Sequence, residues 1–187
     1  MSSATRKSAA TLGALARVEG KAELIAGRIV HLMPTGHRPN TIAGEIFVSL
    51  KNHARTIGRG VAYTGNMGFA VPELPSGRES FSPDASYYDG PLLSNEMDLV
   101  PGTPTFAVEV RSKSDYGHAA EAAMASNRAD SFQAGTLVVW DVDPRALCVC
   151  SYRADASDQG VTFHQGQAAD AEPAVPGWQM TVDCVFA

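Results

Sequence analysis

The segment from Phe106 to Arg111 constrains the fold most, because its pattern predicts a β-strand with a carboxylate in its middle. Apolar residues alternate along it with Ala107, Glu109 and Arg111. A period of two residues places Glu109 and Arg111 on one face and the apolar side chains on the other. Because an ionised carboxylate is costly to bury alone, the pattern indicates that Glu109 has a partner.

A second predicted strand, at 82–88, also contains a carboxylate. Its sequence is Ser-Pro-Asp-Ala-Ser-Tyr-Tyr, with Asp84 at the third position. A metal ion held between Asp84 and Glu109 would compensate both charges. Two ordinary explanations are also open: Asp84 can be a turn residue after Pro83, and Glu109 can be a salt-bridged strand residue.

Length, composition and charge limit the class of the protein. At 187 residues the chain fits one domain, and its hydrophobic content of 44% is enough for a core. No apolar run approaches the roughly 20 residues that a membrane helix needs, so we expect no membrane segment. The net charge of −5 does not favour a highly basic nucleic-acid coat protein. It is compatible with a nuclease whose basic residues gather near a cleft.

The cysteine content bears on location. Cys148, Cys150 and Cys184 are an odd and sparse set, which is a poor disulfide framework and suits a reducing cytoplasm. A zinc site would need a better-spaced set of Cys and His than Cys148-x-Cys150 offers. We therefore expect a cytoplasmic protein with ordinary thiols.

The segment 1–21 is rich in Ser, Ala and Thr, which predicts a flexible N-terminal segment, and hydrophobic periodicity then predicts a single domain at 22–187. The domain opens with a β-hairpin that turns at Ala26-Gly27. The order of the later elements is typical of an α/β (α+β) fold, in which a mixed β-sheet is flanked by helices. The predicted helices cover 39–57 and 118–134, and the strands cover 22–25, 28–33, 61–64, 67–71, 82–88, 106–111, 137–142, 147–152 and 161–164.

The second helix bears on the topology of the predicted sheet. We expect it to cross over between the strands at 106–111 and 137–142 and to make them parallel, in the right-handed sense. Gly135 follows the helix and fits the position that ends it.

Several short motifs occur in a fixed order between residues 22 and 186, and together they carry a resemblance. They resemble the Uma2 (DUF820) family of restriction-endonuclease-like proteins, in the PD-(D/E)xK nuclease superfamily. The motifs are Glu23-Leu-Ile-x-Gly-Arg-Ile-Val30, His37-x-x-x-x-Ile42, Gly68-Phe69, Ser82-Pro-Asp84, Val108-Glu-Val-Arg-Ser-x-Ser-Asp115, Gly135-x-x-x-Val139-Trp-x-Val-Asp-Pro144 and Pro176-Gly-Trp178.

The resemblance implies a restriction-endonuclease-like core and an endonuclease that hydrolyses phosphodiester bonds with a divalent metal, Mg or Mn. Asp84 and Glu109 would bind the metal, and the Val110 carbonyl could add a third ligand. Glu45 would be an additional helical acid near the site, or else an ordinary exposed residue of the helix. The implied partner is nucleic acid, DNA in preference to RNA, and a homodimer is left open.

The chain departs from the family pattern at the catalytic lysine. In the family this lysine lies eight residues before the glycine that ends the helix, and a tyrosine lies four residues before that glycine. Counting back from Gly135 gives Asn127 and Ser131, which share one helix face. Two basic residues are candidate catalytic substitutes: Arg111, two residues after Glu109, and Lys113, two further along. Arg111 can hold a phosphate but cannot lose a proton at ordinary pH.

Three hypotheses follow from the sequence. The first is a metal-dependent endonuclease, based on Asp84 and Glu109. The second is a catalytically impaired family member that binds nucleic acid or a protein, based on Asn127 and Ser131. The third is a metal-free small-molecule binder, which rests only on the acidic net charge. A serine hydrolase is disfavoured because Ser112 and Ser114 are not in a Gly-x-Ser-x-Gly elbow.

Overall fold

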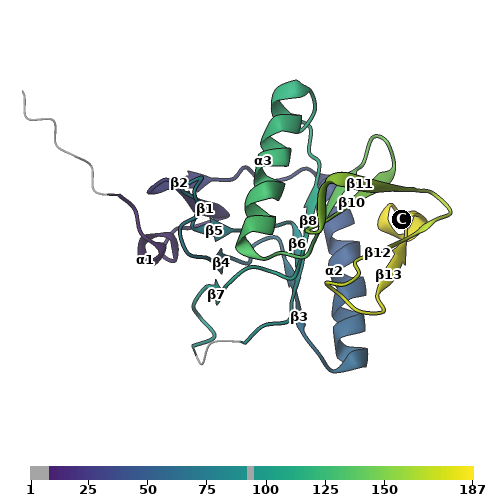
Figure 1. The fold of residues 1–187 in the computed structure, drawn as a ribbon, viewed down its shortest axis with the longest axis horizontal. Helices are drawn as coiled ribbons and strands as arrows, with labels where there is room; N and C mark the ends of the chain where they lie inside the picture. Colours follow the sequence, from purple (N-terminus) through teal and green to yellow (C-terminus); the bar gives the residue numbers. More distant parts are fainter. Residues whose placement is uncertain (1–8, 92–94) are drawn as a thin grey trace, which may run out of the picture.

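The computed structural model describes residues 9–91 and 95–187, and its centre is a mixed sheet of six strands (Figure 1). The strand order is β11-β10-β9-β8-β6-β3. β8 and β9 pair in parallel, and the other neighbours are antiparallel. The bounds are β3 Val61–Thr64, β6 Ala85–Tyr88, β8 Phe106–Val110, β9 Val138–Asp143, β10 Cys148–Arg153 and β11 Ala156–His164.

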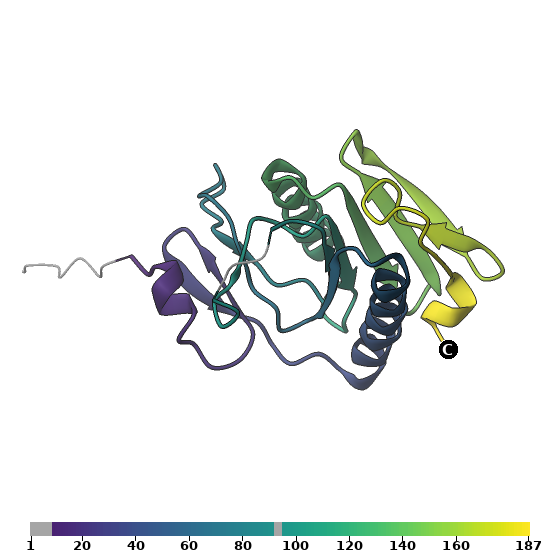
Figure 2. The same cartoon turned by 90° about the horizontal axis from the view of Figure 1, so that it is seen from below.

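Two long helices, α2 (His37–Ile57) and α3 (His118–Ala134), lie on opposite faces of this sheet (Figure 2). α3 connects β8 to β9, so the predicted helical crossover between parallel strands is confirmed. α2 begins two residues before the predicted start, because Pro39 falls in its first turn, where proline is tolerated. α3 ends at Gly135, whose φ of 110° suits a residue without a Cβ.

The alternation predicted for β8 decides which side chains enter the core. Val108 is fully buried in one cluster with Ile42 and Ile46 of α2. Glu109, the next residue, is in register with Asp141 of β9. Paired residues of neighbouring strands point to the same face, so these two carboxylates face the α3 side of the sheet.

Three aromatic rings fill the middle of the core. Phe106 and Trp140 pack edge to face with ring centroids 5.2 Å apart, and Trp178 lies 5.0 Å from Trp140. The indole N–H of Trp140 donates to the Asp170 carbonyl at 3.1 Å, and that of Trp178 donates to Ser49 Oγ at 3.0 Å. Both indoles therefore satisfy their only donor, as buried tryptophans require.

The N-terminal part forms a second, smaller layer beside α3 (Figures 1 and 2). Its hairpin turns at Ala26 and Gly27, as predicted, and both have positive φ. Glu79 N–H donates to the Leu24 carbonyl at 2.9 Å, which attaches the hairpin to the segment before β5. The strand predicted at 67–71 is shorter, with β4 the only part of it assigned. The elements are α1 Leu12–Leu15, β1 Ala22–Ile25, β2 Arg28–His31, β4 Phe69–Ala70, β5 Ser80–Phe81 and β7 Val100–Pro101.

The C-terminal segment closes the core beside α2. Ala169 and Val182 are fully buried in the main cluster. β11 begins five residues before the strand predicted at 161–164. Within the described residues, no helix is long and apolar enough to span a membrane. The remaining elements are β12 Ala168–Asp170, β13 Gln179–Thr181 and α4 Val182–Val185.

Candidate active site

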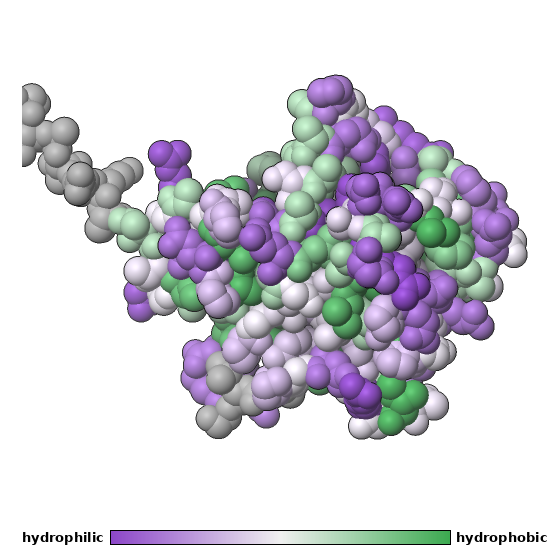
Figure 3. Space-filling view, viewed as in Figure 1, coloured by the Kyte–Doolittle hydropathy of each residue, from purple (hydrophilic) through white to green (hydrophobic). Residues whose placement is uncertain are grey.

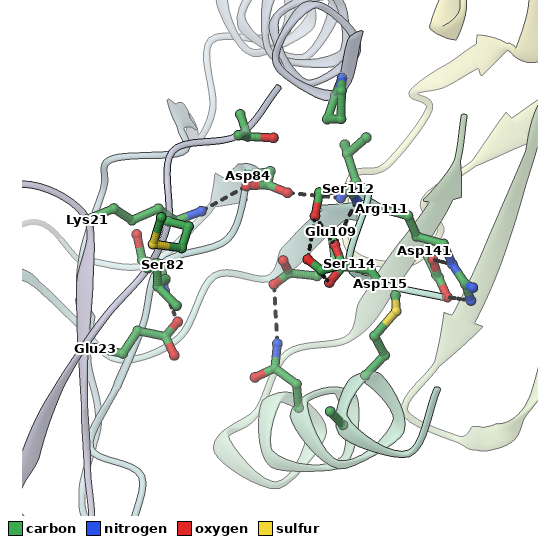
Figure 4. Close-up of a pocket in the computed structure, with 18 of the residues that line it drawn as sticks. Lys21, Glu23, Ser82, Asp84, Glu109, Arg111, Ser112, Ser114, Asp115 and Asp141 are labelled. Carbon is green, nitrogen blue, oxygen red and sulfur yellow. Dashed lines mark hydrogen bonds and ion pairs between the residues drawn. The ribbon is translucent and has the colours of Figure 1, made fainter. Parts of the chain in front are cut away.

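A cavity of about 1160 Å³ lies between the N-terminal hairpin, the end of β8 and one face of α3 (Figure 4). Polar residues and weakly hydrophobic residues are interspersed on the surface around α3 (Figure 3). The cavity brings together most of the predicted site residues with several that were not predicted. Its charged and polar lining includes Lys21, Glu23, Arg78, Asp84, Glu109, Arg111, Lys113, Asn127, Ser131 and Asp141.

Asp84 is fixed by the pairing of β6 with β8. It immediately precedes β6, and its N–H still donates to the Val108 carbonyl at 2.9 Å. Its carboxylate accepts a hydrogen bond from the Val110 N–H at 3.0 Å, and a second from Lys21 Nζ at 2.8 Å. The side chains of Asp84 and Lys21 are each 21% exposed, so both remain open to the cavity. This arrangement holds Asp84 beside the strand that carries Glu109.

Glu109 points into the same cavity as Asp84 (Figure 4). Burial raises the pKa of the Glu109 carboxyl well above its ordinary value, and the charge of Asp84 raises it further. Lys21 and Arg78 act in the opposite direction, and the pKa stays raised. The two acids therefore interact unfavourably when both are ionised, and a cation placed between them would relieve this.

Asn127 and Ser131 face the acids from α3, so the predicted helix face does point at the site. Asn127 Nδ2 lies 3.5 Å from Glu109 Oε1, at the limit of a hydrogen bond. Asn127 Oδ1 is buried with no hydrogen-bond partner among the described residues. Ser131 Oγ donates to the Asn127 carbonyl at 3.0 Å. The face that carries a lysine and a tyrosine in the family pattern here carries two short, uncharged side chains.

Arg111 lines the cavity, but four hydrogen bonds direct its guanidinium to two other carboxylates. Nε and Nη2 donate to Asp141 at 2.8 and 2.7 Å, and Nη1 and Nη2 also bind Glu121. The hydrogen bond with Asp141 contributes most to raising the pKa of Arg111. Its charge is thus already balanced, which makes Arg111 poorly suited to stabilise a phosphate.

Lys113 does not continue the alternation of β8. The strand ends at Val110, and a turn follows in which the Ser112 N–H donates to Asp115 Oδ2 at 2.7 Å. The argument that Lys113 shares a strand face with Glu109 therefore fails, although Lys113 is exposed at the cavity. Glu45 is exposed on α2 and lies outside the cavity lining.

A buried charge network next to the cavity was missed by the sequence analysis. Arg78 binds Glu23, and its Nε donates to Asp130 at 3.1 Å. The other oxygen of Glu23 accepts a hydrogen bond from the Ser82 N–H at 2.9 Å. Ser82 lies two residues before Asp84. All three charged residues are buried. No local pattern joins these three residues, because Glu23, Arg78 and Asp130 are far apart in the sequence and meet only in the fold.

This network yields a prediction for stability. Arg78→Ala leaves two buried carboxylates without their partner, and breaking a buried ion pair from one side costs about 3–5 kcal/mol. We expect the free energy of unfolding, measured in urea, to fall by about that amount. Arg28→Ala, on the exposed side of the hairpin, is the control and should change it by less than about 0.5 kcal/mol. Equal effects of the two variants would contradict a role for the network.

The donor set of the site suits a hard divalent cation. Among residues 9–91 and 95–187, no three His, Cys, Asp or Glu side chains are grouped so as to hold a metal. Mg²⁺ does not require such a cage, since it is usually bound by one or two carboxylates together with waters and substrate phosphates. Asp84 and Glu109 supply two oxygen donors beside an open cavity, so these residues fit such an ion.

Fold and site together define a restriction-endonuclease-like protein: a mixed sheet flanked by helices, with two acids at neighbouring strand ends. Comparison with known proteins agrees. Residues 11–183 match the sequence profile of the Uma2 family, described as "putative restriction endonuclease". The chain therefore belongs to the Uma2 family.

A solved structure supports the same fold. It is described as a putative nuclease belonging to DUF820 from Anabaena variabilis ATCC 29413. The two proteins are 18% identical and superpose with a TM-score of 0.70, over 94% of this chain and 97% of the other. A search of curated proteins found no match.

Proposed function

We propose that this protein is a metal-dependent endonuclease that hydrolyses phosphodiester bonds of nucleic acid, with DNA as the expected substrate. The observation that carries the proposal is the pair of acids, Asp84 and Glu109, which share one cavity in a chain of the Uma2 family. In this proposal they hold Mg²⁺ or Mn²⁺, and the backbone of Val110 borders the same position.

The chemistry assigned to each residue follows from its position. A divalent cation, when bound, polarises the scissile phosphate and lowers the pKa of the attacking water. Asp84 is oriented for this task by the Val110 N–H, which fixes one of its oxygens. Glu109 enters from the same strand as Val110, and its ionised form is the one that would bind a cation. The open cavity admits a phosphate between the hairpin and α3.

A cleavage assay tests the proposal. Single- and double-stranded DNA and RNA are incubated with the protein in Mg²⁺, in Mn²⁺ and in a chelator, and products are resolved on gels. We expect cleavage of at least one substrate, DNA first, that requires the added ion. The proposal fails if calorimetry finds the ion bound while every substrate stays intact.

A second candidate function is a catalytically impaired family member that binds nucleic acid or a protein partner. It is favoured by Asn127 and Ser131, neither of which supplies the cation of the family pattern to the site. Binding of nucleic acid without turnover would support it over the first candidate.

A further inference from the structure

The site needs a cation besides the metal, and position 127 of α3 does not provide one. Arg128, the arginine of α3 in the cavity lining, has its guanidinium stacked over the Tyr152 ring at 3.7 Å. Negative charge builds up on a phosphate as it is attacked, and a positioned cation stabilises that charge. Asn127 is neutral, and Arg111 is held by Asp141 and Glu121. Lys113 lies in the exposed turn after β8. No hydrogen bond or ion pair with another described residue holds its ammonium beside the acids.

Lys21 lies where such a cation is needed. Its ammonium donates to Asp84 Oδ1 at 2.8 Å, and Figure 4 shows it reaching from the hairpin toward Asp84. Lys21 and Asp84 line both the main cavity and a smaller one, of about 650 Å³. The pair therefore lies where the two spaces adjoin, and a phosphate entering from either would meet the ammonium.

The backbone under Lys21 is firmly held. The Lys21 carbonyl accepts the Leu32 N–H at 2.9 Å, which extends the pairing of the hairpin by one step. The next strand residues are attached to the β5 segment, where Leu24 N–H donates to Ser80 Oγ at 2.7 Å. The backbone of Lys21 is thus held like that of a strand residue, and only the side chain of Lys21 is free to move.

Lys21 can either block the metal position or stabilise the phosphate, and the two roles predict opposite effects of removing its charge. A lysine that only plugs the metal position would block binding, so its removal would speed catalysis. A lysine that stabilises the phosphate leaves Asp84 when the metal arrives and binds a phosphate oxygen through its three donors. Lys21 pairs with Asp84 alone, and Glu109 is a second carboxylate in the same cavity. When Glu109 is ionised, the two acids have one negative charge more than Lys21 balances, so a cation can bind while Lys21 stays close.

We propose that Lys21 is the catalytic cation of this site and binds the scissile phosphate in place of the lysine that α3 lacks. This inference rests on the proposed nuclease function. It assigns the role to the residue just before β1, which contacts Asp84, whereas Asn127 of α3 approaches Glu109.

The test compares the wild type with Lys21→Met, which keeps the length of the side chain and removes its charge. Calorimetry measures Mg²⁺ affinity, and single-turnover assays in Mg²⁺ measure cleavage. We expect Lys21→Met to bind Mg²⁺ at least as tightly as the wild type, since a nearby positive charge is gone, and to cleave at least about tenfold more slowly. Lys21→Arg, which keeps the charge, should recover part of the rate.

A binding measurement provides a readout apart from turnover. A mixed-sequence DNA duplex is titrated in Ca²⁺ at several salt concentrations. A lysine that contacts a phosphate contributes about one unit to the slope of log affinity against log salt. Lys21→Met should lower that slope by about one, and Lys21→Arg should not. Lys51→Met, on the outer part of α2 and outside both cavities, is the matched control and should match the wild type.

Two results of the calorimetry and cleavage assays would overturn the role of Lys21. Weaker Mg²⁺ binding together with slower cleavage would mean that Lys21 only positions Asp84. Cleavage as fast as, or faster than, that of the wild type would mean that Lys21 obstructs the site. If the wild type binds Mg²⁺ but cleaves nothing, the nuclease proposal alone fails. The salt slope of Lys21→Met then decides whether Lys21 contacts phosphate, and an unchanged slope rejects that contact.

Discussion

Asp84→Asn is expected to remove metal binding and to reduce cleavage by at least about a thousandfold. The amide is nearly the same size as the carboxylate and can still accept the Val110 N–H, so the local backbone should keep its conformation. What is lost is the charge that binds the cation. A bound metal contributes several kcal/mol of transition-state stabilisation, and each 1.36 kcal/mol is about a tenfold change in rate. Calorimetry with Mg²⁺ and single-turnover assays measure the two effects.

Asp158→Asn is the matched control for this substitution. Asp158 is exposed on β11, outside the cavity lining, so the same chemical change there should leave both measurements unaltered. Retained Mg²⁺ affinity in Asp84→Asn would contradict the assignment of Asp84 as a ligand. Retained affinity with lost cleavage would instead place the ion elsewhere and give Asp84 a different task.

The acids were predictable because their signal is local. Asp84 follows a proline at the start of a short strand, and Glu109 is a carboxylate in the middle of another strand whose other face is apolar. Each pattern can be read within a few residues, and pairing of β6 with β8 then brings the two together. The helix at 118–134 and the parallel pair that it joins were predictable for the same reason, since Gly135 and the apolar strand after it mark the crossover.

The ion pair of Lys21 with Asp84 was not predictable, because it joins distant parts of the chain. Lys21 and Asp84 are 63 residues apart, and the segment that ends at Lys21 has the composition of a flexible N-terminus. Strand alternation alone favoured Arg111, but its guanidinium binds Asp141 on β9, 30 residues further along the chain. Alternation also favoured Lys113, but β8 ends at Val110 and is followed by a turn in which Asp115 accepts the Ser112 N–H. Local patterns thus locate charges, while the tertiary fold decides which charges pair.

Asn127→Lys is expected to raise cleavage by about tenfold or more. Position 127 points at Glu109, so a lysine there would place an ammonium beside the acids, where the family pattern has one. A cation at the scissile phosphate contributes several kcal/mol to the transition state, and about tenfold corresponds to 1.36 kcal/mol of that. The gain should be larger in Lys21→Met, because the new lysine then takes over a role that Lys21 no longer fills.

Ser126→Lys adds the same charge one residue earlier on α3, at an exposed position about 100° around the helix. Ser126→Lys is therefore the control for the added positive charge, because its lysine does not point at the acids. We expect it to leave the cleavage rate of Lys21→Met unchanged. The coupling between positions 21 and 127 is measured from four single-turnover rates: those of the wild type, Lys21→Met, Asn127→Lys and the double variant. Two lysines that serve one phosphate should give gains that do not add. Additive gains, or equal effects of Asn127→Lys and Ser126→Lys, would show that the two positions do not act on the same group.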